Sequence, residues 1–253
     1  NNLCSLRPDE DKLTYSVIFK MTPEADITDW RLVHTVIKSS RRFTYEEAQA
    51  RIEGEDGDYK DEINTLWALA KQLREKRFQN GAVNFDREEM RVEIDSEGKP
   101  VKCYVKVSKE ANKLVEEVML RANRTVAESV GKVKKGQKAK VLPYRVHDVP
   151  DPTKLETLRD FIVRFGYKLK TAGTKGAVTK SLNKLLADCN GKKEQKLIET
   201  VALRAMMKAK YTTHNIGHYG LAFDYYTHFT SPIRRYPDTM VHRLLTRYQK
   251  GGR

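Results

Sequence analysis

The hydrophobic period changes along this chain, and this change constrains its fold class more than any other feature. Strand-like alternation with β-branched and aromatic residues occupies residues 13–21 and 30–37, which predict an antiparallel pair. A second hairpin is predicted from residues 90–94 and 101–107, around a turn at Gly98. Helical periods dominate from residue 108 onward. Strands early and helices late predict an α+β fold, in which a mixed or antiparallel sheet packs with several helices, rather than regular βαβ winding.

Capping signals and apolar stripes predict where the helices lie. Thr44 and Glu47 form a capping box that opens a short helix ending at Gly54. Residues 61–78 predict a longer helix, and residues 108–130 carry the clearest amphipathic pattern. The remaining predictions are helices at residues 152–165, 180–188, 194–207 and from 231 onward, with strand-like segments near Tyr211 and at residues 221–226.

The charge of the chain favours an anionic partner. There are 48 Lys and Arg against 34 Asp and Glu, a formal net charge of +14. Such a balance favours nucleic acid or an anionic membrane, although it also fits a plain basic surface. No apolar run approaches the ~18–20 residues of a membrane span, so we expect no membrane partner. The three cysteines form no metal-spaced pair, which fits a reducing compartment such as the cytoplasm.

The segment Ser-Pro-Ile-Arg-Arg-Tyr at residues 231–236 resembles a helix start directed at an anion. Ser231 suits an N-cap and Pro232 suits the first helical position. Arg234 and Arg235 would then lie in the first turn, where the helix dipole disfavours cations. A bound phosphate would reverse that cost, because it accepts from backbone N–H groups and guanidinium forks together. The alternative is that Arg234 pairs with Asp238 and that Arg235 is solvated.

A family resemblance adds to this interpretation. Residues 218–243 resemble the signature of the ribonuclease II / ribonuclease R family, the RNB-type exoribonucleases, with ribonuclease R the most similar type. Residues 2–8, 144–148 and 203–220 resemble further blocks of the same family. Ala205 and Tyr219 depart from the commonest pattern, where serine and phenylalanine are frequent. The resemblance covers essentially all of residues 1–253, which we interpret as part of one RNB catalytic domain, incomplete at both ends.

The resemblance implies a processive 3′→5′ hydrolase that releases nucleoside 5′-monophosphates from RNA. The expected partner is the 3′ end of single-stranded RNA, and the expected enzyme is a cytoplasmic monomer. Its chemistry uses Mg²⁺, whose ligands we expect in an Asp-rich loop outside this sequence, as we do the flanking OB-fold domains. Alone, this chain is therefore expected to be inactive. The acidic clusters at residues 9–11 and 56–58 lie in turn contexts and are not expected to bind metal.

The resemblance also assigns roles to single residues. Arg234 matches the family arginine that contacts the phosphate beside the scissile bond, so it is the candidate catalytic residue. Tyr45 and Phe85 match aromatic residues that line the RNA path, where stacking tolerates any base. The alternatives are an ordinary first helical turn for Tyr45 and a buried strand position for Phe85.

Four further residues complete the expected RNA-binding set. Glu116 matches a family glutamate that could accept a hydrogen bond from a ribose 2′-OH. Asn123 lies two turns further along the same helix and could either contact phosphate or act structurally. Ser231 and Arg235 belong to the expected phosphate grip. Glu117, beside Glu116, is expected to pair with Arg121 on the helix surface.

Two other function classes remain open from sequence. One is a non-catalytic RNA-binding relative that keeps the fold but lacks a working metal loop. The other is a generic nucleic-acid-binding α+β domain.

Overall fold

The computed structural model describes residues 4–84, 89–133, 136–137 and 139–252. This part of the chain contains helices and three two-stranded antiparallel sheets, which confirms the predicted α+β class. The strands are β1 (Asp11–Met21), β2 (Ile27–Lys38), β3 (Glu89–Ile94), β4 (Pro100–Lys106), β5 (Tyr144–Val146) and β6 (Lys210–Thr212). The α-helices are α1 (Tyr45–Ile52), α2 (Lys60–Gln79), α3 (Glu110–Gly131), α4 (Pro152–Ile162), α5 (Lys175–Asp188), α6 (Gln195–Ala205) and α7 (Tyr236–Gln249).

Both predicted hairpins are present. β1 pairs with β2, with Tyr15 opposite His34, and β3 pairs with β4. The third pair, β5 with β6, joins segments that are far apart in sequence. Residues 221–226 do not form a strand, contrary to the sequence pattern. A 3₁₀ turn, η2 (Tyr219–Leu221), and isolated bridges such as His218 with Phe223 occupy this region instead.

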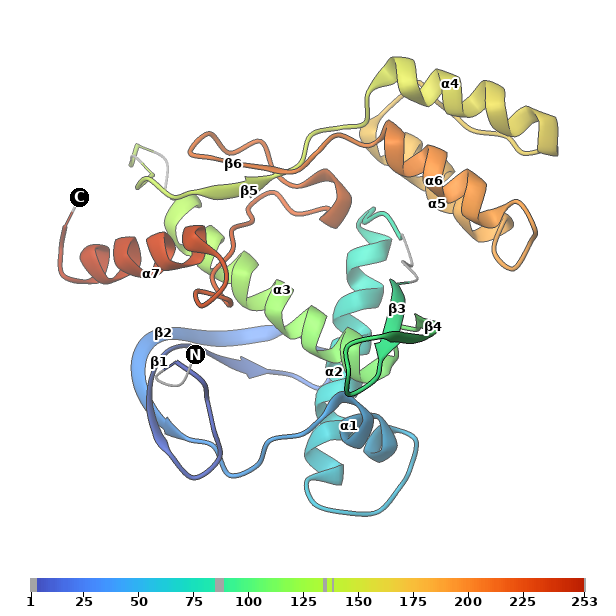
Figure 1. Cartoon of the computed structure of the whole chain (residues 1–253). Coiled ribbons are helices and arrows are strands. Elements are labelled where there is room, and N and C mark those ends of the chain that lie inside the picture. The colour runs from blue at the N-terminus through green and yellow to red at the C-terminus, as the bar shows by residue number, and fades with distance from the viewer. Residues whose placement is uncertain (1–3, 85–88, 134–135, 138, 253) are drawn as a thin grey trace.

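Helix α3 contacts elements from both the early and the late parts of the chain. Figure 1 shows it crossing the middle of the molecule, with α1 and α2 near its start and β5 and α7 near its end. Its start is tied to α1 by Gln49, whose amide donates to Glu110 (2.7 Å) and accepts from the backbone N–H of Ala111 (3.0 Å). The capping box of α1 is present as predicted, because Thr44 and Glu47 exchange side-chain-to-backbone hydrogen bonds.

The two larger of three apolar clusters in the described chain join most of its helices. One lies among α4, α5 and α6 and includes the fully buried Leu158, Leu182 and Ile198. The other joins α3, β5 and α7 through residues such as Val126 and Val241. Burying one such side chain contributes roughly 1.5–3 kcal/mol. Among the described residues, none of the helices combines the length and apolar character needed to cross a membrane.

A buried ion pair fixes α2 against α3. Arg77 is 6% exposed and Glu117 is 3% exposed, and the guanidinium contacts both carboxylate oxygens. Arg74 lies 3.6 Å from the same carboxylate. The expected pairing of Glu117 with Arg121 is therefore wrong, because Glu117 faces α2 rather than solvent. The helical i, i+4 rule describes exposed positions, and the α2 contact overrides it at this buried one.

This ion pair makes an asymmetric prediction for stability. Arg77→Met should lower the free energy of unfolding by about 3 kcal/mol, because it leaves a buried carboxylate short of its main partner. The double variant Arg77→Met/Glu117→Leu should lose much less, since both charges leave the interior together. Urea unfolding of the two variants measures the difference. The control Lys99→Met removes an exposed pair with Glu97, so it should change stability by less than ~1 kcal/mol. Equal losses in the single and double variants would contradict the prediction.

Candidate functional site

The segment around Ser231 forms a turn rather than the first turn of a helix. The backbone N–H groups of Arg234 and Arg235 donate to the carbonyl of Ser231 (3.3 and 3.1 Å), and α7 begins only at Tyr236. The predicted N-cap role of Ser231 is therefore wrong. A helix continuing from Ser231 would place Pro237 in its interior, where proline removes a hydrogen bond and clashes with the preceding turn. At the second position of α7, Pro237 costs no hydrogen bond. Residues 231–235 are called the arginine turn below.

The later start changes which face of α7 is buried. Ile233 and Tyr236, which a helix starting at Ser231 would place together on its apolar face, are 56% and 69% exposed. The buried residues of α7 are instead Asp238, Val241 and Leu245.

Three consecutive backbone N–H groups leading into the arginine turn are held by side chains from two helices. The side-chain oxygen of Asn123 on α3 accepts from the N–H groups of Phe229 (2.8 Å) and Thr230 (3.2 Å). A carboxylate oxygen of Asp238 on α7 accepts from the N–H of Ser231 (2.7 Å). Asn123 is 2% exposed and Asp238 is fully buried. The alternative structural role of Asn123 is thus the one that its contacts support, and Asn123 acts by positioning the turn.

The two arginines of the turn have different partners. Arg235 makes a two-pronged contact with Asp238, through Nε (3.0 Å) and Nη2 (2.9 Å). The alternative pairing of Arg234 with Asp238 is therefore wrong. Arg234 is exposed, and its guanidinium contacts the hydroxyl of Ser231 at 3.5 Å. In the described part of the chain, no carboxylate forms a salt bridge with Arg234, so its charge is available to an anion.

A neutral histidine faces this positive charge. Burial, together with the nearby positive charge of Arg235, lowers the pKa of His228 to about 4. Its Nδ1 is hydrogen-bonded to the hydroxyl of Tyr211 (2.6 Å). Arg145 lies over the Tyr211 ring, 4.7 Å from its centroid. At neutral pH the imidazole adds no charge, so an anion beside the arginine turn would meet polar or cationic neighbours on this side.

The other expected RNA-binding residues lie along α3 and α1. Glu116 is half-exposed and 3.5 Å from the guanidinium of Arg77. It precedes Asn123 by two helical turns, and the amide of Asn123 also contacts the hydroxyl of Tyr226 (3.3 Å). Burial raises the pKa of Tyr226 to about 12, so this hydroxyl stays protonated. Tyr45 is 45% exposed at the first position of α1. Phe85 lies outside the described residues.

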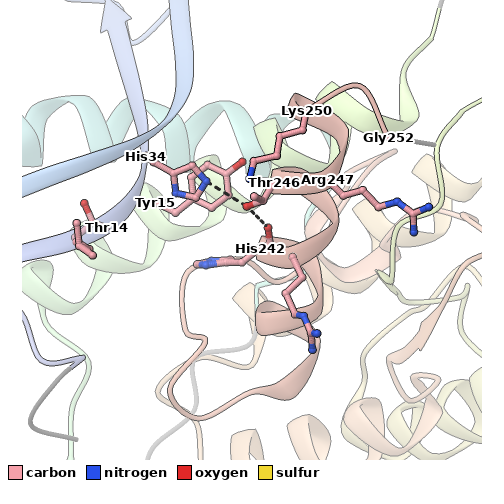
Figure 2. Close-up of a pocket in the computed structure, with 10 residues that line it drawn as sticks. Thr14, Tyr15, His34, His242, Thr246, Arg247, Lys250 and Gly252 are labelled. Atoms are coloured by element: carbon pink, nitrogen blue, oxygen red, sulfur yellow. Dashed lines mark hydrogen bonds between the residues drawn. The ribbon is translucent and has the colours of Figure 1, made fainter.

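Side chains of the β1–β2 hairpin contact α7, as Figure 2 shows. His34 hydrogen-bonds Thr246 (3.1 Å), and Tyr15 stacks on His34 with ring centroids 4.1 Å apart. His242 donates to the carbonyl of Phe229 (2.8 Å), which joins α7 directly to the segment before the arginine turn. These side chains line an open pocket of about 720 Å³. These contacts join the hairpin to α7, the helix that carries Asp238.

The acidic side chains of the described residues are dispersed or already paired with basic ones. The described residues contain no group of three or more His, Cys, Asp or Glu suited to a metal ion. In the two acidic clusters, Glu10 pairs with Lys12 (2.7 Å) and Asp56 with Lys60 (2.7 Å). Asp58 is shared between Arg41 and Arg51. The described residues thus do not fit a resident Mg²⁺ ion.

Sequence reasoning missed Asp238 as an anchor, Arg77 as the partner of α3, and the proximity of His228 to the arginines. Asp238 had one usable signal, because it lies three residues after Arg235 and can reach it within one helical turn. The other two depend on contacts between distant segments, which left no local pattern.

Comparison with known proteins identifies the family. The family model for the RNB domain matches residues 1–251 of this chain. The chain is 38% identical to ribonuclease R of Aquifex aeolicus over 260 residues, covering 98% of this chain and 35% of that protein. Ribonuclease R of Mycoplasma genitalium, solved with ribose-methylated single-stranded RNA, superposes with a TM-score of 0.86 at 25% identity, covering 98% of this chain and 38% of that one. Yeast Ssd1, described as a pseudonuclease, shares the fold with a TM-score of 0.70 at 22% identity, covering 96% of this chain and 30% of that one. The chain spans about a third of the length of such relatives, and it belongs to the RNB-domain family of ribonuclease R-like proteins.

Proposed function

We propose that the protein containing this chain is a 3′→5′ exoribonuclease that hydrolyses single-stranded RNA processively to nucleoside 5′-monophosphates. The family membership supports the reaction class. The observation that carries the proposal is the exposed guanidinium of Arg234, on a turn that Asn123 and Asp238 hold in place. We further propose a cytoplasmic monomer, and the free thiols of Cys4, Cys103 and Cys189 fit a reducing compartment.

The proposed role of Arg234 is to hold the phosphate beside the scissile bond and to stabilise the negative charge that grows in the transition state. A guanidinium presents a rigid fork of donors that matches two phosphate oxygens. Arg235 is less suited to this role, because Asp238 already occupies its fork. Its proposed contribution to RNA binding is the positive potential that it adds beside the turn. The hydroxyl of Ser231 can donate to the same phosphate while accepting from Arg234.

The remaining residues would bind features that every nucleotide shares. The half-exposed carboxylate of Glu116 can accept from a ribose 2′-OH, which DNA lacks. Tyr45 and Phe85 are proposed to stack on bases near the 3′ end, which suits an enzyme that acts on any sequence. Hydrolysis by this family depends on Mg²⁺, which would neutralise phosphate charge. We propose that its ligands lie outside the described residues.

Substitution of Arg234 tests the proposal directly. In the intact protein, Arg234→Ala should reduce single-turnover cleavage of an RNA oligonucleotide by roughly 10²–10³-fold, the usual loss for one transition-state donor. The Kd for the same RNA should change only modestly, because many other contacts bind the strand. The matched control Arg164→Ala removes an exposed arginine from the short 3₁₀ turn that follows α4, far from the arginine turn, and should leave cleavage unchanged.

Near-normal cleavage by Arg234→Ala would sink the proposed role of this arginine. If the wild-type protein binds RNA but never cleaves it with Mg²⁺ present, it is instead a non-catalytic RNA-binding member of the family. Tighter binding of DNA than of RNA would contradict the proposed role of Glu116.

Asp238→Asn should separate positioning from folding. The variant keeps an acceptor for the N–H of Ser231 but loses the charge that holds Arg235. We expect faster amide hydrogen exchange at Ser231, because a neutral amide oxygen is a weaker acceptor than a carboxylate. Cleavage should be at least tenfold slower at saturating RNA. A uniform rise in exchange across α3 and α7 would show general unfolding and contradict the positioning role. Unchanged exchange at Ser231 would do so as well.

The aromatic residues should set the length of the final product. Tyr45→Ala and Phe85→Ala each remove a proposed stacking surface worth ~1–3 kcal/mol per base, so short RNAs should dissociate earlier and leave longer end products. Tyr45→Phe keeps the ring and should leave the product length unchanged. Gel analysis of a 5′-labelled RNA measures the outcome. An end product of wild-type length in the alanine variants would indicate packing roles instead.

A further inference from the structure

In the described part of the chain, Arg121 on α3 is a partly buried cation that forms no salt bridge. Its Nε is buried and has no hydrogen-bond acceptor among the described residues. The partner expected from sequence, Glu117, is occupied by Arg77 from α2. A guanidinium does not lose its proton in a protein, so Arg121 cannot relieve this burial by becoming neutral. Nothing in the proposed exoribonuclease mechanism uses this residue.

The Arg121 side chain faces a small cavity. The cavity has a volume of about 160 Å³ and lies where the β1–β2 turn, the end of α2, α3 and the segment after η2 meet. Figure 1 shows α2 passing near the start of α3, and the pair of Arg77 with Glu117 joins the two helices beside the cavity. Asp26, Asn80 and Phe223 contribute to its walls. A water molecule needs roughly 10–15 Å³ of such space, so the cavity has room for several waters or for a small anion.

The acidic groups of the cavity are already paired. Asp26 is bound by Lys76 (2.6 Å), and Glu117 is bound by Arg77. These pairs are neutral in sum, so neither carboxylate is available to balance Arg121.

Arg124, three residues further along α3, does not change the net charge of the cavity. Arg124 pairs with Glu128 (2.7 Å) and lies over the ring of Phe223. The charge of Arg124 also acts with burial to lower the pKa of Arg121. Glu128 also attracts Arg121, but its carboxylate is already bound to Arg124. Among the described residues that line the cavity, the positive charge of Arg121 is therefore left without a carboxylate of its own.

The end of α2 offers only partial compensation. Helix C-termini carry a partial negative charge of ~0.5 of an elementary charge, spread over exposed carbonyls. The basic residues of the last turn, Lys76 and Arg77, already face this end. A full anion in the cavity would balance Arg121 more completely than this dipole can.

We propose that this cavity is a binding site for a phosphate oxyanion, held by the guanidinium of Arg121. The guanidinium fork favours a ligand with two or more oxygens in one plane, as in phosphate, over a spherical chloride. The phosphate could belong to the RNA backbone or to a free phosphate or nucleoside monophosphate. This site is separate from the arginine turn and does not depend on the proposed hydrolysis.

Thermal unfolding of the intact protein tests the site. In chloride buffer, adding inorganic phosphate at constant ionic strength should raise the wild-type midpoint by roughly 5 °C at saturation. Arg121→Met keeps the aliphatic length and removes the charge. Its midpoint in phosphate-free buffer should equal or exceed that of the wild type, and its response to phosphate should disappear. The control Arg31→Met, at an exposed position of β2, should keep the full response.

A phosphate response that persists in Arg121→Met would overturn the proposal, as would a wild-type midpoint that does not respond at all. Calorimetric titration of the wild type with inorganic phosphate gives an answer that needs no variant, and the absence of binding at millimolar phosphate would also overturn it.

Two further arms distinguish the source of the phosphate. If the site holds an RNA backbone phosphate, Arg121→Met should weaken binding of a single-stranded RNA about tenfold and reduce its salt dependence by the equivalent of one contact, ~0.7 in log–log slope. If it holds a free phosphate, RNA binding should be unchanged, while titration with a nucleoside monophosphate or inorganic phosphate loses its signal in the variant.

Discussion

Two buried side chains, Asn123 and Asp238, hold the backbone of residues 229–231, and the geometry of the candidate site depends on them. This backbone lies outside any helix or strand, so its N–H groups have no regular partners. A buried N–H without an acceptor is costly, and most in folded proteins are satisfied. Asn123 on α3 and Asp238 on α7 satisfy three in succession. The arginine turn is thus fixed to two helices at once, and its position cannot change without breaking hydrogen bonds inside the core.

The same carboxylate explains why two arginines follow each other in the turn. Asp238 is fully buried, and an unpaired buried carboxylate would cost several kcal/mol. Arg235 balances it through two hydrogen bonds and is thereby removed from contact with a ligand. Arg234 does not contact this carboxylate and is exposed to solvent. Arg235 stabilises the turn, whereas Arg234 is available to bind an anion. Neither arginine can therefore replace the other.

Local signals in the sequence predicted local structure well. The alternation of β1 and β2 and the capping box at Thr44 involve residues close in sequence, and both are present. Predictions failed where a second signal or a distant contact competed with the local pattern. Ser231 and Pro232 suit a helix start, but Pro237 prevents the helix from continuing, and α7 begins at Tyr236. The pairing of Glu117 could not be found by spacing, because its partner Arg77 lies forty residues earlier on α2. The anchoring role of Asp238 was not anticipated, because the pairing considered from sequence was with Arg234 rather than with Arg235.

Helix α3 sets the distances between the parts of the site. Its start is bound to α1, which carries Tyr45, and Glu116 and Asn123 follow along its length. Seven residues separate Glu116 from Asn123, a rise of ~10 Å in an α-helix, and Asn123 holds the segment leading to Arg234. An enzyme that acts on any RNA sequence must recognise the repeating ribose and phosphate rather than the bases. Under the proposed function, one rigid helix suits that task, because it holds a ribose-binding carboxylate and the support of a phosphate-binding turn at a set distance. The ion pair of Arg77 with Glu117 holds the turn of α3 that carries Glu116 against α2.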